Sequence, residues 1–198
     1  GNPALAHILK VEQGIAQAAA RLAAAPAEPG SEFPPGEFGN ALRTAARVLA
    51  GGAGVAALRL GLNGFDTHRN QPGMHANLLR QLAEGLVALK AALNELRRWD
   101  DTLILTYAEF GRRPRENESN GTDHGTANVH LALGGRVRGG LYGAPPALDR
   151  LDGNGNLPFA VDFRSLYATV LERWWGMAAA PVLGARHEVL PILKGSPA

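Results

Sequence analysis

Apolar side chains recur every three or four residues in four stretches of this sequence, and such spacing predicts amphipathic helices. The most regular stretch begins near Pro72, repeats leucine over about 25 residues and ends with two arginines, which suit a last helical turn. The fourth helix is expected to begin at Asp162, a good N-cap, and to stop at Gly176. Its predicted buried face contains Leu166, Val170 and Trp174. The other two predicted helices cover residues 4–25 and 38–50.

Three short apolar runs predict buried strands, at residues 55–62, 102–108 and 129–133. The long helix joins the first two runs, and a strand–helix–strand crossover makes its two strands parallel. We therefore expect an α/β fold with a mixed, largely parallel sheet and flanking helices. Four prolines and two glycines in residues 26–36 predict a linker. This divides the chain into an N-terminal helix with a Pro-rich linker, residues 1–36, and an α/β domain, residues 37–198.

Composition narrows the classes of protein that the chain can belong to. Hydrophobic residues make up 45% of its 198 residues, which is enough for a buried core and excludes wholesale disorder. The absence of cysteine excludes a disulfide scaffold, a zinc ribbon, an iron–sulfur site and thiol catalysis. A net charge of +2 with scattered arginines is not typical of a nucleic-acid-binding protein. No apolar run approaches the roughly 20 residues of a transmembrane helix.

Three polar clusters lie at the ends of the predicted strands: Gly64–His68, Glu109–Arg112 and Gly121–Gly125. The first two follow parallel strands, so both are expected at the carboxyl edge of the sheet, where ligands bind in open α/β folds. The third precedes its strand. It therefore shares that edge only if the strand at 129–133 runs antiparallel to the others or if the loop folds back.

The clusters contain the side chains that hold hard or borderline divalent cations. These candidate metal ligands are Asp66, His68, Glu109, Asp123 and His124. Together they predict a site for one or two ions of Zn²⁺, Mn²⁺, Mg²⁺ or Ca²⁺. The adjacent residues Asp123 and His124 either bind two different ions, or one of them binds an ion and the other orients it. The alternative is that the carboxylates only cap loops. Shared ligation requires Asp66, His68 and His124 to converge to within about 5 Å.

One cationic residue beside these clusters has two interpretations. Arg112 is a candidate anion-binding residue, because a guanidinium can bind a phosphate or sulfate group. A salt bridge from Arg112 to Glu116 or Glu118 is the alternative.

Four ordered blocks of sequence carry a family resemblance. They read GFDTHRNQ, TLILTYAEFGRRPREN, GTDHGTANVHLALGGRVRGGLYG and DFRSLYATVLERWWG. In these blocks the chain resembles a bacterial family of unknown function, often exported by the twin-arginine route, within the alkaline phosphatase and sulfatase superfamily. The resemblance implies an alkaline-phosphatase-like fold, a periplasmic or exported location and a small anionic ester as substrate.

The resemblance also implies roles for individual residues. Asp66 and His68 match ligands of the superfamily's first metal, and His124 completes that site, with Asp123 as an extra ligand or the orienter of His124. At the second metal only Glu109 matches, because Ala108 and Glu109 stand where the superfamily has an acidic residue and a histidine.

The superfamily's nucleophile lies upstream of its first-metal residues. Before Asp66 the chain has only two hydroxyl residues, Ser31 and Thr44, and neither is expected at a strand-to-helix turn. We therefore expect a C-terminal portion of the full domain, and no catalytic residue is predicted. The expected function is that of a metal-dependent hydrolase of phosphate or sulfate esters without its nucleophile. The alternative is a non-catalytic metal- or ligand-binding scaffold.

Overall fold

The computed structural model describes Lys10, Glu12, Gly14 and Ala20, residues 29–51 and residues 54–195. It forms two compact units. Unit 1 comprises Gly1–Phe65 and Ala76–Trp99, and unit 2 comprises Asp66–His75 and Asp100–Ala198. The predicted boundary after residue 36 falls inside unit 1 and stays a prediction. Of the predicted helix at 4–25, the four described residues are helical and the others lie outside the described part.

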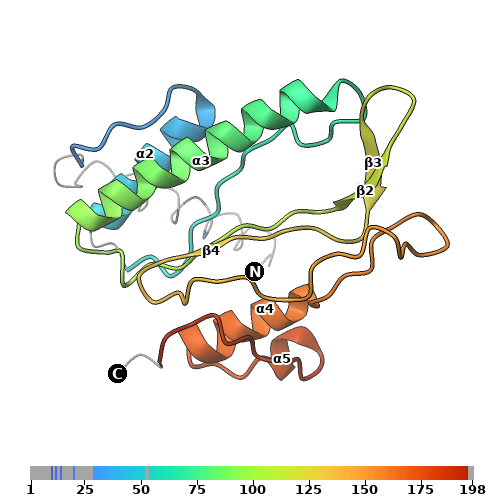
Figure 1. The fold of residues 1–198 in the computed structure, drawn as a ribbon. Helices are drawn as coiled ribbons and strands as arrows, with labels where there is room; N and C mark the ends of the chain where they lie inside the picture. Colours follow the sequence, from blue (N-terminus) through green and yellow to red (C-terminus); the bar gives the residue numbers. More distant parts are fainter. Residues whose placement is uncertain are drawn as a thin grey trace, which may run out of the picture. The chain divides into compact units, whose positions relative to one another are not determined.

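Two helices lie side by side in unit 1, α2 at Glu37–Ala50 and α3 at Gln71–Glu95, whose first turn belongs to unit 2 (Figure 1). Both confirm the helices predicted from leucine and alanine spacing. At Gly85 of α3 an added Cβ would lie 2.6 Å from Leu42 Cδ1 and 2.8 Å from a ring carbon of Phe38. The missing side chain therefore lets the two helices approach closely, and Leu42 is only 1% exposed there.

The predicted strand at residues 55–62 is wrong. This segment has no strand partner, and it exposes Val55 and Leu58 to solvent. An apolar run becomes a strand only where a neighbour completes its hydrogen bonds, and none of the described strands pairs with this segment.

The strands of unit 2 are short and antiparallel. β1 at Ile104–Leu105 pairs with β4 at Ala132–Leu133, inside two of the predicted strands. Between these two strands, where no strand was expected, the chain forms a hairpin in which β2 at Gly111–Glu116 pairs with β3 at Thr122–Gly125. All strand pairs among the described residues are antiparallel, so the largely parallel sheet is not seen there.

The C-terminal part of unit 2 is helical. α4 at Phe163–Thr169 continues as a π-helical turn, η1 at Val170–Trp174, and α5 covers Ala180–Leu183. Asp162 caps α4 as predicted, by accepting the Arg164 backbone N–H at 2.8 Å. The buried face is shifted by about one residue from the predicted one and contains Ser165, Ala168, Thr169 and Leu171.

The shift of this face has a local cause. The hydroxyl of Thr169 donates to the Ser165 carbonyl at 2.7 Å and accepts the Leu190 N–H at 2.8 Å. These bonds turn the polar side of the helix inward against the following chain. No described helix of the protein is both long and apolar enough for a membrane crossing.

Candidate metal centre

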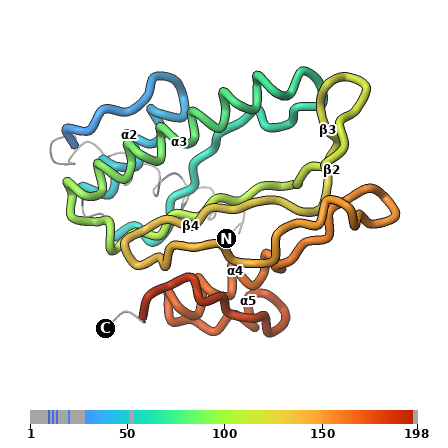
Figure 2. The backbone as a smooth tube through the Cα atoms, in the orientation of Figure 1, coloured from blue at the N-terminus to red at the C-terminus, as the bar shows by residue number. Residues whose placement is uncertain are grey.

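Backbone hydrogen bonds join the start of α3 to the tip of the β2–β3 hairpin (Figure 2). Residues 67–71 and 119–122 are linked by three such bonds. They run from Thr122 N to Thr67 O at 3.4 Å, from Asn70 N to Ser119 O at 3.0 Å and from Gln71 N to Asn120 O at 2.8 Å. The bonds fix the segment that carries Asp66 and His68 against the hairpin that carries His124.

Gly121 makes this close approach feasible. An added Cβ at Gly121 would lie 2.2 Å from the carbonyl carbon of His68 and 2.6 Å from the backbone N of Arg69. Any side chain there would displace the segment that carries His68. A glycine at the hairpin tip is thus required by contact between two backbones rather than by an unusual φ angle.

Three side chains converge at this junction. Asp66 Oδ1 lies 2.7 Å from His124 Nε2 and 3.0 Å from His68 Nε2, and the two imidazole nitrogens are 3.1 Å apart. Potential ligand atoms of the three residues all lie within 4.8 Å of one another, as shared ligation requires. Each of the three side chains is about half exposed, so an ion or ligand can reach them from solvent.

Phe110 and Arg112 support the second histidine of this group. The Phe110 ring stacks on the His124 ring with centroids 3.7 Å apart, and the Arg112 guanidinium lies 5.0 Å from the Phe110 centroid. Arg112 also faces His124 across the hairpin in the strand register. The imidazole is therefore held between an aromatic face and the neighbouring strand.

Arg112 forms a salt bridge with Asp66, a residue of the three-residue group. Its Nη1 donates to the Thr122 carbonyl at 2.5 Å, and its Nη2 lies 3.4 Å from Asp66 Oδ1. The guanidinium thus borders the three-residue group, where its positive charge faces the same space as the ligand atoms.

Asp123 and Asn117 lie behind His68. Asp123 Oδ1 is 3.5 Å from His68 Nδ1, the ring nitrogen that does not face Asp66. Asn117 Nδ2 donates to Asp123 Oδ1 at 3.3 Å and to the His68 carbonyl at 3.0 Å. Of the two roles considered for Asp123, the structure favours an orienter, although of His68 and not of His124.

Hydrogen bonds and nearby positive charge favour the ionised form of both aspartates. The hydrogen bond from His124, with further help from His68 and Arg112, lowers the pKa of Asp66 below its usual value despite some desolvation. The hydrogen bond from Asn117 is the largest cause that lowers the pKa of Asp123. Both carboxylates are therefore charged at neutral pH, as a cation site requires.

Glu109 does not join the group. Its side chain is exposed, just before Phe110 and β2. Among the described residues, the converging group consists of Asp66, His68 and His124. Sequence reasoning also missed two residues that shape the site, Phe110 and Asn117. The only signal for Asn117 was its position in the polar stretch ENESNG, since asparagine commonly builds turns.

The three donor atoms fit a single divalent ion. The three atoms lie 2.7–3.1 Å from one another, so Asp66, His68 and His124 together would hold one ion rather than two. Two imidazoles and one carboxylate suit Zn²⁺, Mn²⁺ or Fe²⁺. The side opposite the protein would remain available for other ligands.

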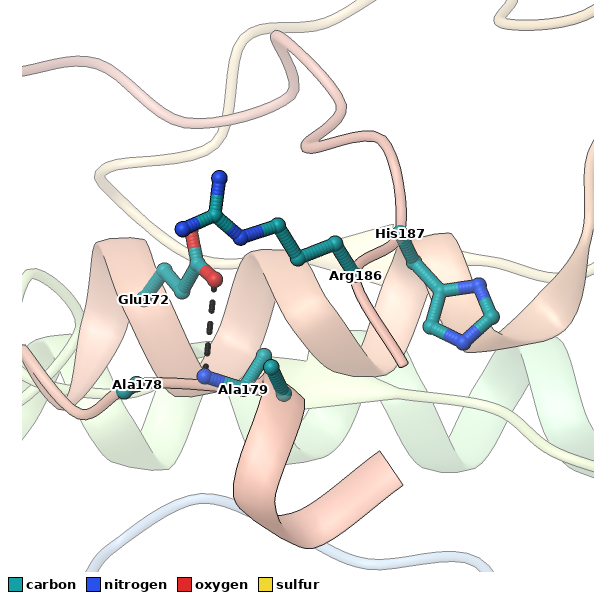
Figure 3. A pocket seen from close by; sticks show the side chains of 6 residues that line it. Glu172, Ala178, Ala179, Arg186 and His187 are labelled. Atoms are coloured by element: carbon teal, nitrogen blue, oxygen red, sulfur yellow. Dashed lines mark hydrogen bonds between the residues drawn. The ribbon is translucent and has the colours of Figure 1, made fainter. Parts of the chain in front are cut away.

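A separate cavity of about 350 Å³ lies in the C-terminal part of unit 2 (Figure 3). Glu172, Arg186 and His187 line it together with three alanines. The Glu172 carboxylate accepts the Ala179 N–H at 3.4 Å, and the cavity shares no residue with the three-residue group. Because a converging set of ligand atoms is found only at the hairpin among the described residues, the candidate site is placed there.

The structure thus describes a protein with an exposed Asp–His–His group held by a β-hairpin. The sequence matches a family of proteins of unknown function, DUF1501, over residues 3–185, and the chain belongs to this family. This confirms the resemblance to a family of unknown function. No curated protein and no solved structure matches the chain.

Proposed function

We propose that the protein binds one divalent metal ion through Asp66, His68 and His124 and acts in the hydrolysis of phosphate or sulfate esters. The convergence of Asp66 Oδ1 with both Nε2 atoms supports this proposal. The similarity of its sequence blocks to sulfatases and alkaline phosphatases supplies the reaction class. Membership of that superfamily, its largely parallel sheet and a periplasmic or exported location are parts of the same proposal.

The chain's own residues supply binding and orientation. A bound ion polarises an ester oxygen and stabilises negative charge on the reacting group. Asp66 and the two histidines hold the ion from one side. Arg112, fixed by the Thr122 carbonyl, places a positive charge beside them and attracts the anionic group of an ester.

A non-catalytic metal-binding scaffold is the second candidate function, and one observation favours it. Ser31, a hydroxyl residue considered as a nucleophile, donates to the Glu95 carboxylate, and Thr44 donates to the Asn40 carbonyl at 2.9 Å. Both residues belong to unit 1, whereas the three candidate ligands belong to unit 2, and neither hydroxyl is part of the converging group. Metal binding without turnover is the expected behaviour of such a scaffold.

Elemental analysis tests the metal site. After dialysis against Zn²⁺ or Mn²⁺ and removal of excess ion, we expect about one equivalent per chain. His68→Ala and His124→Ala each remove a ligand and should abolish this uptake, whereas His75→Ala, outside the group, should retain it. Uptake below about 0.1 equivalent in the unaltered chain would contradict the proposal.

Turnover of aryl phosphates and aryl sulfates then separates the two functions. Hydrolysis that requires added metal and is lost in both histidine variants supports the hydrolase. Stoichiometric metal binding with no turnover of either ester class supports the scaffold.

A further inference from the structure

We propose that Asp123, held in place by Asn117, is a positioning residue for His68 rather than a metal ligand. This inference rests on the proposed function, because it concerns the same site. It goes beyond the proposed function by assigning a role to two residues outside the ligand set, Asp123 and Asn117.

The two nitrogens of the His68 ring face different partners. Nε2 points to Asp66 Oδ1 and His124 Nε2, at 3.0 and 3.1 Å, while Nδ1 lies 3.5 Å from Asp123 Oδ1. A histidine that binds a metal through one nitrogen presents the N–H of its other nitrogen to a carboxylate or carbonyl, which fixes its tautomer and orientation. Asp123 occupies this outer position.

Asn117 uses both ends of its amide to hold Asp123 there. Its Nδ2 donates to the Asp123 carboxylate and to the His68 carbonyl, at 3.3 and 3.0 Å. Its Oδ1 accepts the backbone N–H groups of Ser119 and Gly121, both at 3.0 Å. One side chain therefore ties together the hairpin turn, the outer carboxylate and the segment that carries His68.

The observed contacts of Asp123 are with N–H donors. Its Oδ1 lies 3.3 Å from Asn117 Nδ2 and 3.5 Å from the His68 ring nitrogen Nδ1. The converging group of ligand atoms among the described residues does not include Asp123. Glu109, the residue expected at a second metal, does not join the converging group of described residues.

Metal stoichiometry and affinity test the inference directly. We expect one Co²⁺ or Zn²⁺ per chain in the unaltered protein, in Asp123→Asn and in Asn117→Ala, since none of these changes removes a ligand. Asp123→Asn replaces the charged acceptor of His68 by a neutral one, and Asn117→Ala removes the group that holds it. Mutation of such outer partners typically weakens metal binding by about 10- to 100-fold, so both variants should show this loss of affinity. Asn154→Ala and Asp149→Asn, on exposed loops, serve as matched controls.

An exchange of the two residues separates positioning from charge. The double variant Asn117→Asp with Asp123→Asn keeps the net charge, keeps an acceptor for the turn and moves the carboxylate from the His68 ring to the side of the His68 carbonyl. We expect it to bind about as weakly as Asp123→Asn. The absorption spectrum of bound Co²⁺ should also change, while far-UV circular dichroism stays that of the unaltered chain.

The possible outcomes distinguish a failure of this inference from a failure of the proposed function. Two ions per chain, falling to one in Asp123→Asn, would make Asp123 a ligand and overturn the inference alone. Full affinity in the exchanged variant, or in both single variants, would do the same. Absence of any bound ion in the unaltered protein would overturn the proposed function as well.

Discussion

One oxygen, Asp66 Oδ1, receives both imidazole nitrogens of the candidate site and lies within 3.4 Å of the Arg112 guanidinium. Three groups that can each carry positive charge therefore crowd one exposed carboxylate. Such crowding is favourable only while the aspartate is ionised, and the lowered pKa of Asp66 follows from it. The negative charge of Asp66 therefore holds His68, His124 and Arg112 together at the site.

Asp162 shows the same principle in a structural role. Its carboxylate accepts the Arg164 backbone N–H and the Arg164 side chain, which together lower its pKa to about 2. A carboxyl with a lowered folded-state pKa stabilises the fold above its unfolded pKa of about 4, and this stabilisation is lost as the pH falls toward 2.

Asp162→Asn is therefore expected to destabilise the protein at pH 5 and to have little effect at pH 2. Asparagine keeps the N-cap acceptor but cannot pair ionically with Arg164. Urea unfolding of both proteins between pH 5 and pH 2 measures the difference, with Asp149→Asn as the control. A difference in stability that stays constant across this range would contradict the assignment.

At the scale of elements, the hairpin tip and the start of α3 depend on one another. We expect Gly121→Ala to cost about 1–3 kcal/mol of stability, because its Cβ would overlap the backbone of His68 and Arg69. It should also weaken metal binding, since the segment with Asp66 and His68 must move. Thermal unfolding and metal titration measure both effects.

Gly153→Ala is the control for this prediction. Gly153 is exposed, and an added Cβ there meets no atom within 4 Å, so its effect should stay within about 0.5 kcal/mol. Equal effects of the two substitutions would show that loss of glycine itself, and not the contact with residues 68–69, is responsible.

The sequence predicted elements well where a local pattern determines them. α2, α3 and the cap at Asp162 follow from apolar spacing and N-cap chemistry, which depend on near neighbours. The predicted strand at 55–62 failed because strand formation depends on a distant partner. The β2–β3 hairpin was missed because GRRPREN lacks the alternation of a half-buried strand.

The candidate metal site, like the fold, was predicted only in part from the sequence. Residue chemistry alone indicated Asp66, His68 and His124, and the structure brings these three together. It could not exclude Glu109, because exposure and distance depend on the course of the chain. The role of Asn117 was also hidden, since its four hydrogen bonds join parts of the chain that the sequence does not show to be close.

At the scale of the whole molecule, the chain consists of two compact units, and the three candidate ligands all belong to unit 2. A ligand that binds only the folded state stabilises by mass action, by about 2.7 kcal/mol when its concentration is 100 times Kd. This stabilisation acts first on the unit that holds the ligand atoms.

Hydrogen exchange should therefore respond to metal in a localised way. We expect added Zn²⁺ to slow amide exchange in residues 67–71 and 111–125 of unit 2. Amides of α2, in unit 1, should change much less. The same experiment with His124→Ala should show no slowing in either unit, and a uniform effect across the chain would contradict localised stabilisation.

The three backbone hydrogen bonds between residues 67–71 and 119–122 also have a kinetic consequence. His68 and His124 are 56 positions apart in the sequence, so the closing of a long loop must precede their meeting. An unfolded chain offers only local pairs, Asp66 with His68 and Asp123 with His124. A metal ion bound at the proposed site would therefore act mainly on the finished structure, by slowing the rate at which it opens.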